Sequence, residues 1–170
     1  MPFEKIELSA LQAEPFAMIG KQWMLITAEK GGRVNTMTAS WGGLGVLWGQ
    51  DVAFVFIRPQ RYTREFVEAA GRFTLSFYAE EHRPALAWLG KVSGRDEDKI
   101  AKVGFVPRDF DGAPAFEQAD TVLVCKTLYA QPLDPACFVP GCDADSRWYP
   151  DKDYHTMYVA RIEAAYRKSE

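Results

Sequence analysis

The 170-residue sequence has only two histidines and three cysteines, and it has no long hydrophobic run. Because no stretch approaches about 18 uninterrupted apolar residues, we expect no membrane-spanning segment. Neither sign of charge dominates, since 20 Lys and Arg residues face 23 Asp and Glu residues, for a formal net charge of -3. Proteins that bind nucleic acids or membrane surfaces concentrate positive charge, so we expect neither partner.

Common catalytic and nucleotide-binding motifs are also missing. Cys125, Cys137 and Cys142 are odd in number and follow no metal-ligand spacing, which predicts reduced thiols and no metal site. No Ser/His/Asp triad or Walker phosphate loop stands out, and a glycine pattern at 43–48 has tryptophan where its last glycine belongs. The polar start lacks an apolar signal core and favours a cytoplasmic location.

The sequence is rich in core-forming and aromatic side chains. Hydrophobic residues make up 48%, charged residues 25% and aromatic residues 14%. The length predicts one domain, residues 1–170, that is large enough to bury a substantial core. Aromatic residues favour strands, but they also line sites for flat ligands, and composition alone leaves both uses open.

Strand patterns outnumber helix patterns along the chain. The predicted strands are 23–28, 34–41, 51–57, 73–77, 121–130 and 156–167. The predicted helices are 64–70, 84–89 and 96–103, while 42–45 reads as a flexible connection and 132–153 as a long irregular loop. Without regular strand–helix–strand alternation, this pattern favours a mainly β protein: an antiparallel barrel with a few short helices.

The segment 35–41 carries a candidate binding surface. Strand alternation separates a hydroxyl row from an apolar row: Thr36, Thr38 and Ser40 against Met37, Ala39 and Trp41. Such a surface suits a ligand with a polar tail and a flat ring. A half-exposed strand gives the same pattern without a ligand, and the pattern alone favours that simpler interpretation.

The segment 58–63 carries a candidate anion site, because it follows a buried strand and opens a helix for which Thr63 is the expected N-cap. Helix N-termini attract phosphate, and the planar guanidinium groups of Arg58 and Arg61 match phosphate oxygens. Solvated arginines with a simple cap explain the pattern equally well.

Four motifs in register resemble the flavin reductase-like family, and the nearest resemblance is to its flavoredoxin branch. The similarity extends from about residue 20 to residue 164. The motifs are Asn-Thr-Met-Thr-Ala-Ser-Trp at 35–41 with Trp48, Arg-Pro-Gln-Arg-Tyr-Thr at 58–63, Ser-Gly-Arg-Asp-Glu-Asp-Lys at 93–99, and Tyr-His-Thr at 154–156.

The resemblance implies a split β-barrel of Greek-key type that binds FMN non-covalently, as a homodimer with the flavin near the interface. Residues placed along the ring and ribityl chain are Thr36, Met37, Thr38, Ala39, Ser40 and Trp41. Residues placed at or beside the phosphate end are Arg58, Arg61, Tyr62 and Thr63. Ser93, Arg95 and Lys99 would close the site from either subunit, and His155 would lie near the ring as the candidate catalytic residue.

The implied activity is hydride transfer from NAD(P)H, as a transient co-substrate, to flavin or through bound FMN to an acceptor. Two other functions remain open at this stage. One is a flavoredoxin-like FMN electron carrier reduced by a redox protein partner. The other is a barrel that binds a different flat ligand without redox chemistry.

Overall fold

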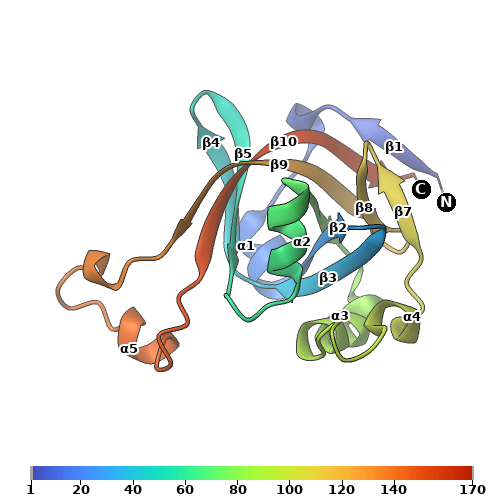
Figure 1. Cartoon of the computed structure of the whole chain (residues 1–170). Helices are drawn as coiled ribbons and strands as arrows, with labels where there is room; N and C mark the ends of the chain where they lie inside the picture. The colour runs from blue at the N-terminus through green and yellow to red at the C-terminus, as the bar shows by residue number, and fades with distance from the viewer. Residues whose placement is uncertain (1, 170) are drawn as a thin grey trace.

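The computed structural model describes residues 2–169 and is dominated by antiparallel strands. The strands are β1 (Phe3–Ile6), β2 (Met24–Lys30), β3 (Arg33–Ala39), β4 (Gly42–Leu47), β5 (Gln50–Ile57), β6 (Arg72–Phe77), β7 (Pro107–Phe110), β8 (Ala113–Phe116), β9 (Thr121–Pro132) and β10 (Thr156–Lys168). Eight of them form a curved sheet in the order β3-β2-β6-β9-β10-β5-β4, with β1 beside β10, and β7 and β8 form a separate hairpin (Figure 1). The prediction of a mainly β antiparallel fold is confirmed.

The helices are all short. They are α1 (Pro15–Ala17), α2 (Thr63–Ala70), α3 (Arg83–Lys91), α4 (Lys99–Val103) and α5 (Ala144–Trp148), with 3-10 turns at Leu8–Ala10, Glu80–His82 and Pro135–Cys137 and a π turn at Met18–Gln22. Within residues 2–169, no helix has the length and apolar character needed to cross a bilayer.

Two apolar clusters fill the molecule. The first lies between the concave sheet and α2, where Phe66 and Val67 are fully buried. The second lies beneath α3 and α4, where Leu86, Leu89 and Ile100 pack against β8 and β9. Strand β10 pairs with β9, β5 and β1, and it therefore ties the two sides of the sheet together.

The predicted flexible connection at 42–45 is wrong, because these residues form β4 and pair with β5 along its length. Glycine disfavours strands in sequence patterns, which hides this element. The structure shows why glycine stands at the start of the strand. Gly42 has φ +152°, and a Cβ there would lie 2.6 Å from the carbonyl oxygen of Phe54.

Several other elements also differ from expectation. The helix predicted at 96–103 begins only at Lys99, because the side chain of Asp98 accepts a hydrogen bond from the backbone N–H of Ala101 at 3.1 Å and caps it. The β7–β8 hairpin and β1 were not predicted. The irregular loop expected at 132–153 holds α5 and a 3-10 turn.

Residues 133–155, here called the arm, leave the barrel between β9 and β10. The arm carries α5 and projects to one side of the sheet (Figure 1). Its base is closed by a hydrogen bond from the backbone N–H of Leu133 to the carbonyl of His155 at 2.9 Å. The arm's inner side therefore faces the ends of β3 and β5.

Candidate functional site

A cleft of about 420 Å³ opens where the arm meets the barrel. The end of β3, the end of β5 with the segment after it, and the arm each supply part of the wall. The lining residues are Met37, Thr38, Ala39, Ser40, Trp41, Phe56, Arg58, Gln60, Arg61, Trp148 and His155.

Aromatic rings form one wall of this cleft. Trp41 and Trp148 meet edge to face with ring centroids 5.0 Å apart, and the imidazole of His155 lies 5.1 Å from Trp41. Both indoles remain partly exposed. Rings in this arrangement offer flat, polarizable surface to a planar ligand.

A smaller hollow of about 140 Å³, here called the inner cavity, lies beside the cleft. The two hollows share Met37, Gln60 and Arg61 as lining residues. The inner cavity adds Asn35, Tyr62, Thr63, Lys91, Val92, Ser93, Gly94 and Lys99. An aromatic cleft therefore adjoins a hollow lined by hydroxyl, amide and ammonium groups.

Arg61 bridges the two hollows. Its guanidinium donates to the carbonyl of Gly90 at 2.7 Å and to the carbonyl of Thr38 at 3.1 Å, and it thereby links the end of α3 to β3. Burial lowers the pKa of Arg61, and the nearby charge of Arg58 lowers it further. An arginine stays protonated in proteins, so this group holds a fixed positive charge at the site.

Lys99 is the second cation of the inner cavity and is buried. Its ammonium group donates to the carbonyls of Leu89 at 2.7 Å and Val92 at 2.9 Å. Burial, together with the charge of Arg61, lowers the pKa of Lys99 to about 8. At neutral pH the side chain is mostly charged, although its environment disfavours that charge.

Neither Arg61 nor Lys99 forms an ion pair with a carboxylate anywhere in residues 2–169. Buried charges are costly unless they are paired. The buried Lys99 and the half-buried Arg61 lie beside one cavity and are satisfied only by carbonyl oxygens, which favours an anionic ligand. The neighbouring Thr63 and Ser93 hydroxyls and the Lys91 ammonium suit phosphate oxygens.

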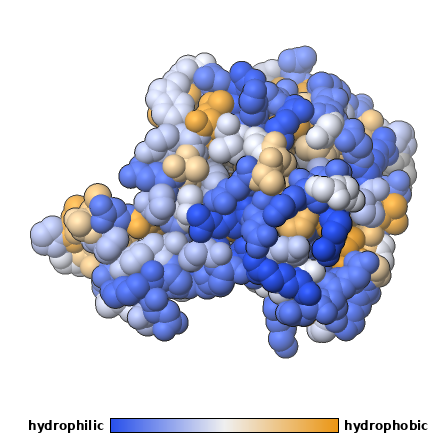
Figure 2. Space-filling view, in the orientation of Figure 1, coloured by the Kyte–Doolittle hydropathy of each residue, from blue (hydrophilic) through white to orange (hydrophobic). Residues whose placement is uncertain are grey.

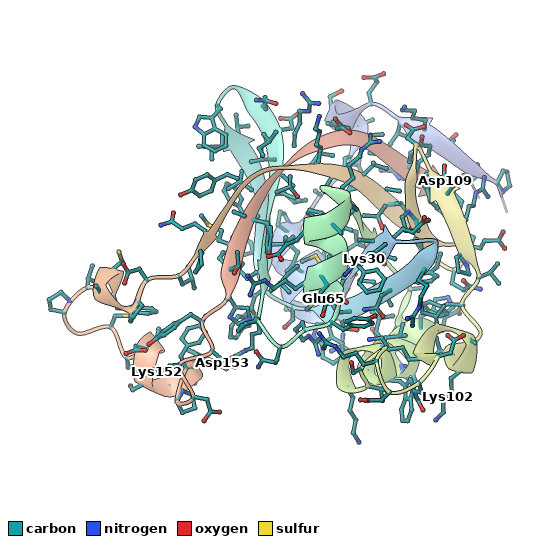
Figure 3. All side chains as sticks on the ribbon, viewed as in Figure 1. Lys30, Glu65, Lys102, Asp109, Lys152 and Asp153 are labelled. Atoms are coloured by element: carbon teal, nitrogen blue, oxygen red, sulfur yellow. The ribbon has the colours of Figure 1, made fainter. Side chains whose placement is uncertain are left out.

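Arg58, in contrast, is engaged with the arm. Its guanidinium pairs with Asp153 at 2.5 Å and donates to the carbonyl of Trp148 at 2.9 Å. Gln60 donates to the same carboxylate at 2.7 Å, and Asp153 lies where the arm returns to the barrel (Figure 3). These contacts fasten the arm against the segment that follows β5.

His155 lies at the base of the arm with only 8% of its surface exposed. Its Nδ1 is 2.8 Å from the hydroxyl of Tyr149. Burial and the charges of Arg58 and Arg61 lower the pKa of His155 to about 4, against an opposing effect of Asp153. The ring is therefore neutral at physiological pH.

The structure brings together most of the site residues predicted from the sequence. Those in the cleft are Met37, Thr38, Ala39, Ser40, Trp41, Arg58, Arg61 and His155. Those in the inner cavity include Tyr62, Thr63, Ser93 and Lys99. Residues of both predicted rows line the cleft: Thr38 and Ser40 from the hydroxyl row, and Met37, Ala39 and Trp41 from the apolar row.

Two predicted residues lie apart from both hollows. Thr36 is fully buried, and its hydroxyl meets that of Thr27 at 2.8 Å and donates to the carbonyl of Ile26. Arg95 places its guanidinium 4.3 Å from the ring centroid of Tyr62 and forms an ion pair with Glu65. Arg95 also donates to the carbonyl of Gln60 at 3.3 Å, so it contacts the site through Tyr62 and Gln60.

The expected N-cap role of Thr63 is wrong. Thr63 is the first residue of α2, and the helix has no side-chain cap; its hydroxyl accepts a hydrogen bond from the amide of Asn35 at 3.0 Å. Sequence reasoning also missed several lining residues, among them Phe56, Gln60 and Lys91. Gln60 lies inside the motif at 58–63, whereas nothing in the sequence pattern singles out Lys91.

The curved antiparallel sheet and its short helices define an architecture that matches FMN-binding split-barrel proteins. Residues 16–170 match the family described as the flavin reductase like domain. The chain belongs to the flavin reductase-like family.

Solved structures show the same fold at low sequence identity. An FMN-binding domain of a flavin reductase-like enzyme from Shewanella baltica OS155 is 18% identical with a TM-score of 0.69, covering 98% of this chain and 77% of that chain. A flavoredoxin of Desulfovibrio vulgaris is 20% identical with a TM-score of 0.68, covering 94% and 76%. The flavin reductase of a styrene monooxygenase from Pseudomonas putida S12 is 19% identical with a TM-score of 0.62, covering 85% and 77%. No curated protein matches the chain.

Proposed function

We propose that this chain binds FMN non-covalently in the cleft and inner cavity, and that it passes a hydride from NAD(P)H to flavin or through bound FMN to an acceptor. The observation that carries the proposal is a pair of cations, the half-buried Arg61 and the buried Lys99, beside an aromatic cleft. In the described part of the chain neither cation meets a carboxylate, so a ligand phosphate would supply the missing negative charge.

The residues present fit both ends of FMN. The inner cavity offers Lys99, Arg61 and the hydroxyls of Thr63 and Ser93 to the phosphate. The cleft offers flat apolar surface to the ring, chiefly from Trp41. The two hollows share Met37, Gln60 and Arg61, so an elongated ligand with its ring in the cleft would have its polar end near the inner cavity.

When bound, FMN supplies the hydride-accepting chemistry, and the protein supplies position and electrostatics. Arg61 and Lys99 would anchor the ligand, while Trp148 would restrict water at the outer side of the cleft. His155 is neutral, so it would act as a hydrogen-bonding group rather than as a cationic acid. A nicotinamide that stacks transiently on a flavin needs no dinucleotide-binding loop of its own. The incomplete glycine pattern at 43–48 is consistent with this mode of binding.

The absorbance spectrum of the purified protein tests the proposal most directly. We expect flavin bands in the purified protein or after addition of FMN, and loss of those bands when NAD(P)H is added without oxygen. A protein that takes up no FMN at micromolar concentration would overturn the proposal.

A flavoredoxin-like electron carrier is the second candidate, because the fold is shared with a flavoredoxin as well as with a flavin reductase. Stopped-flow reduction separates the two. An NAD(P)H-dependent enzyme is reduced rapidly by NADH or NADPH, whereas a carrier is reduced slowly by both and rapidly by a redox protein partner.

We also propose that the protein forms a homodimer with the cleft near the interface. Apolar side chains on the arm and at the β4–β5 turn are exposed, and Val139 on the arm and Val46 by the turn are about 70% accessible. Figure 2 shows apolar surface on the projecting arm. The outer face of β5 carries Phe54 and Phe56, which are only half buried. Two-fold pairing is the commonest way to cover such surface, and a monomer in light scattering would contradict it.

A further inference from the structure

Tyr149 and His155 form an isolated hydrogen-bonded pair at the base of the arm. The Tyr149 hydroxyl lies 2.8 Å from Nδ1 of His155, and both residues are buried, with 4% and 8% of their surfaces exposed. Within residues 2–169, neither the hydroxyl of Tyr149 nor the imidazole makes another side-chain hydrogen bond. The pair must therefore be satisfied by a single hydrogen between the two atoms.

The direction of this hydrogen bond follows from the donors available. A phenol carries one hydrogen, and burial raises the pKa of Tyr149, so that hydrogen is retained at neutral pH. If Nδ1 of His155 donated instead, the buried phenol hydrogen would have no acceptor, at the full desolvation penalty of an unmade hydrogen bond. The favourable arrangement has Tyr149 donating and Nδ1 accepting.

From this geometry we infer that Tyr149 is a positioning residue, which holds His155 in the tautomer that carries its hydrogen on Nε2 and so presents a hydrogen-bond donor to the cleft. A neutral imidazole has one donor and one acceptor nitrogen, so fixing the role of Nδ1 fixes that of Nε2. His155 lines the cleft, and Nε2 has no protein partner in the described chain.

The arm holds Tyr149 in place for this role. The Arg58 guanidinium lies 5.1 Å from the centroid of its ring, and the ring of Tyr154 packs against it at 4.8 Å. Arg58 is itself paired with Asp153, and Arg61 is the other charged group that acts on His155. The contacts that fasten the arm thus also orient the imidazole.

The ligand class recognised by this donor follows directly. Nε2–H favours a carbonyl oxygen or a pyridine-type nitrogen at the edge of a flat ring, and it disfavours a ligand N–H at that point. Recognition of the flavin ring by this donor rests on the proposed function. The tautomer itself does not depend on it, because it is a property of the protein without ligand.

Nitrogen NMR of the isotopically labelled, ligand-free protein tests the tautomer. The chain has only two histidines, so a His82→Gln variant assigns the signals of His155. We expect a protonated Nε2 and an unprotonated, hydrogen-bonded Nδ1 at neutral pH. A proton on Nδ1 would overturn the inference, whether or not the protein binds FMN.

A pair of matched variants tests the role of Tyr149. Tyr149→Phe removes the donor, so the Nδ1 signal should move to that of a nitrogen without a hydrogen bond. Tyr154→Phe removes a hydroxyl that instead contacts Asp145 at 2.6 Å, and it should leave the signals of His155 unchanged. Unaltered His155 signals in Tyr149→Phe would contradict the positioning role.

In the FMN-loaded protein, Tyr149→Phe should also slow reduction by NAD(P)H roughly fivefold, the equivalent of one net hydrogen bond of about 1 kcal/mol. A wild-type protein that shows the expected tautomer but no FMN binding would preserve the inference about Tyr149 and reject the proposed function. A normal rate in Tyr149→Phe would show that the donor does not serve the reaction.

Discussion

Arg61 and Lys99 line the same inner cavity, where burial and the charge of Arg61 lower the pKa of Lys99 to about 8. Each cation donates only to backbone carbonyls, and no carboxylate in residues 2–169 pairs with either. A phosphate in this cavity would relieve their mutual repulsion. Ligand binding should therefore depend on the protonation of Lys99.

FMN affinity is expected to fall as the pH rises from about 7 to about 9. Lys99 is charged below its pKa of about 8 and loses its charge above it, so the attraction to phosphate weakens in that range. The limit is about tenfold for each pH unit above the pKa. Titrations of protein with FMN, followed by flavin fluorescence at several pH values, measure the effect.

Riboflavin and a lysine variant supply the controls for this pH dependence. Riboflavin lacks the phosphate, so its affinity should not change over the same pH range. Lys99→Met should bind FMN weakly and with little pH dependence. An equal loss of affinity for riboflavin would show that another group titrates.

Arg61→Lys should destabilise the protein by about 1–3 kcal/mol even without ligand. The substitution retains the charge, but an ammonium cannot reproduce the planar bridge from Thr38 to Gly90. Urea unfolding measures the loss.

Arg64→Lys is the matched control, because Arg64 forms an exposed ion pair with Glu68 one helical turn away. That change should cost less than about 0.5 kcal/mol, and equal losses in the two variants would refute the bridging role.

Trp148→Ala should weaken FMN binding about tenfold, or about 1.4 kcal/mol, because it removes one aromatic wall of the cleft. Trp48→Ala removes the same side chain at the β4–β5 turn, where it contacts Tyr129 and lines neither hollow. Fluorescence titration should find near wild-type affinity for Trp48→Ala. Similar losses in both variants would place the binding determinant elsewhere, for example in a shared dimer interface.

Local patterns predicted the parts of the fold that depend on local chemistry. The strand at 51–57 is an almost continuous apolar run, the strand at 73–77 alternates clearly, and α2 ends where Gly71 adopts a left-handed conformation with φ +64°. Strand β4 could not be predicted, because glycine at position 42 is required by a close approach to the Phe54 carbonyl, and that approach is not visible in the sequence. The β7–β8 hairpin was also not predicted. Its two short strands pair with each other, and this pairing is not visible in the local sequence pattern.

The candidate site was likewise predictable only where it depends on local sequence. Segments 37–41 and 58–63 were recognisable as motifs, and the structure places both at the cleft. The contacts between distant segments were not predictable, because they depend on how the arm returns to the barrel. The approach of Trp148 to Trp41 is one such contact. The role of Thr63 was also not predictable from local sequence. Its hydroxyl accepts a hydrogen bond from Asn35 of β3 and does not cap its own helix, α2.

Gly94→Ala should weaken FMN binding about tenfold or more and lower stability by about 1–3 kcal/mol. A Cβ at position 94 would lie 2.3 Å from Oδ1 of Asn35, whose amide donates to Thr63. The amide must move, and with it one wall of the inner cavity.

Gly20→Ala is the matched control for this substitution, because no atom lies within 4 Å of the position of its Cβ. It should leave FMN affinity unchanged and stability within about 1 kcal/mol of the wild type. Urea unfolding and FMN titration of both variants separate the two effects. If Gly94→Ala bound FMN as tightly as Gly20→Ala, the phosphate would not lie in the inner cavity, because the added methyl group would have displaced the wall that holds it.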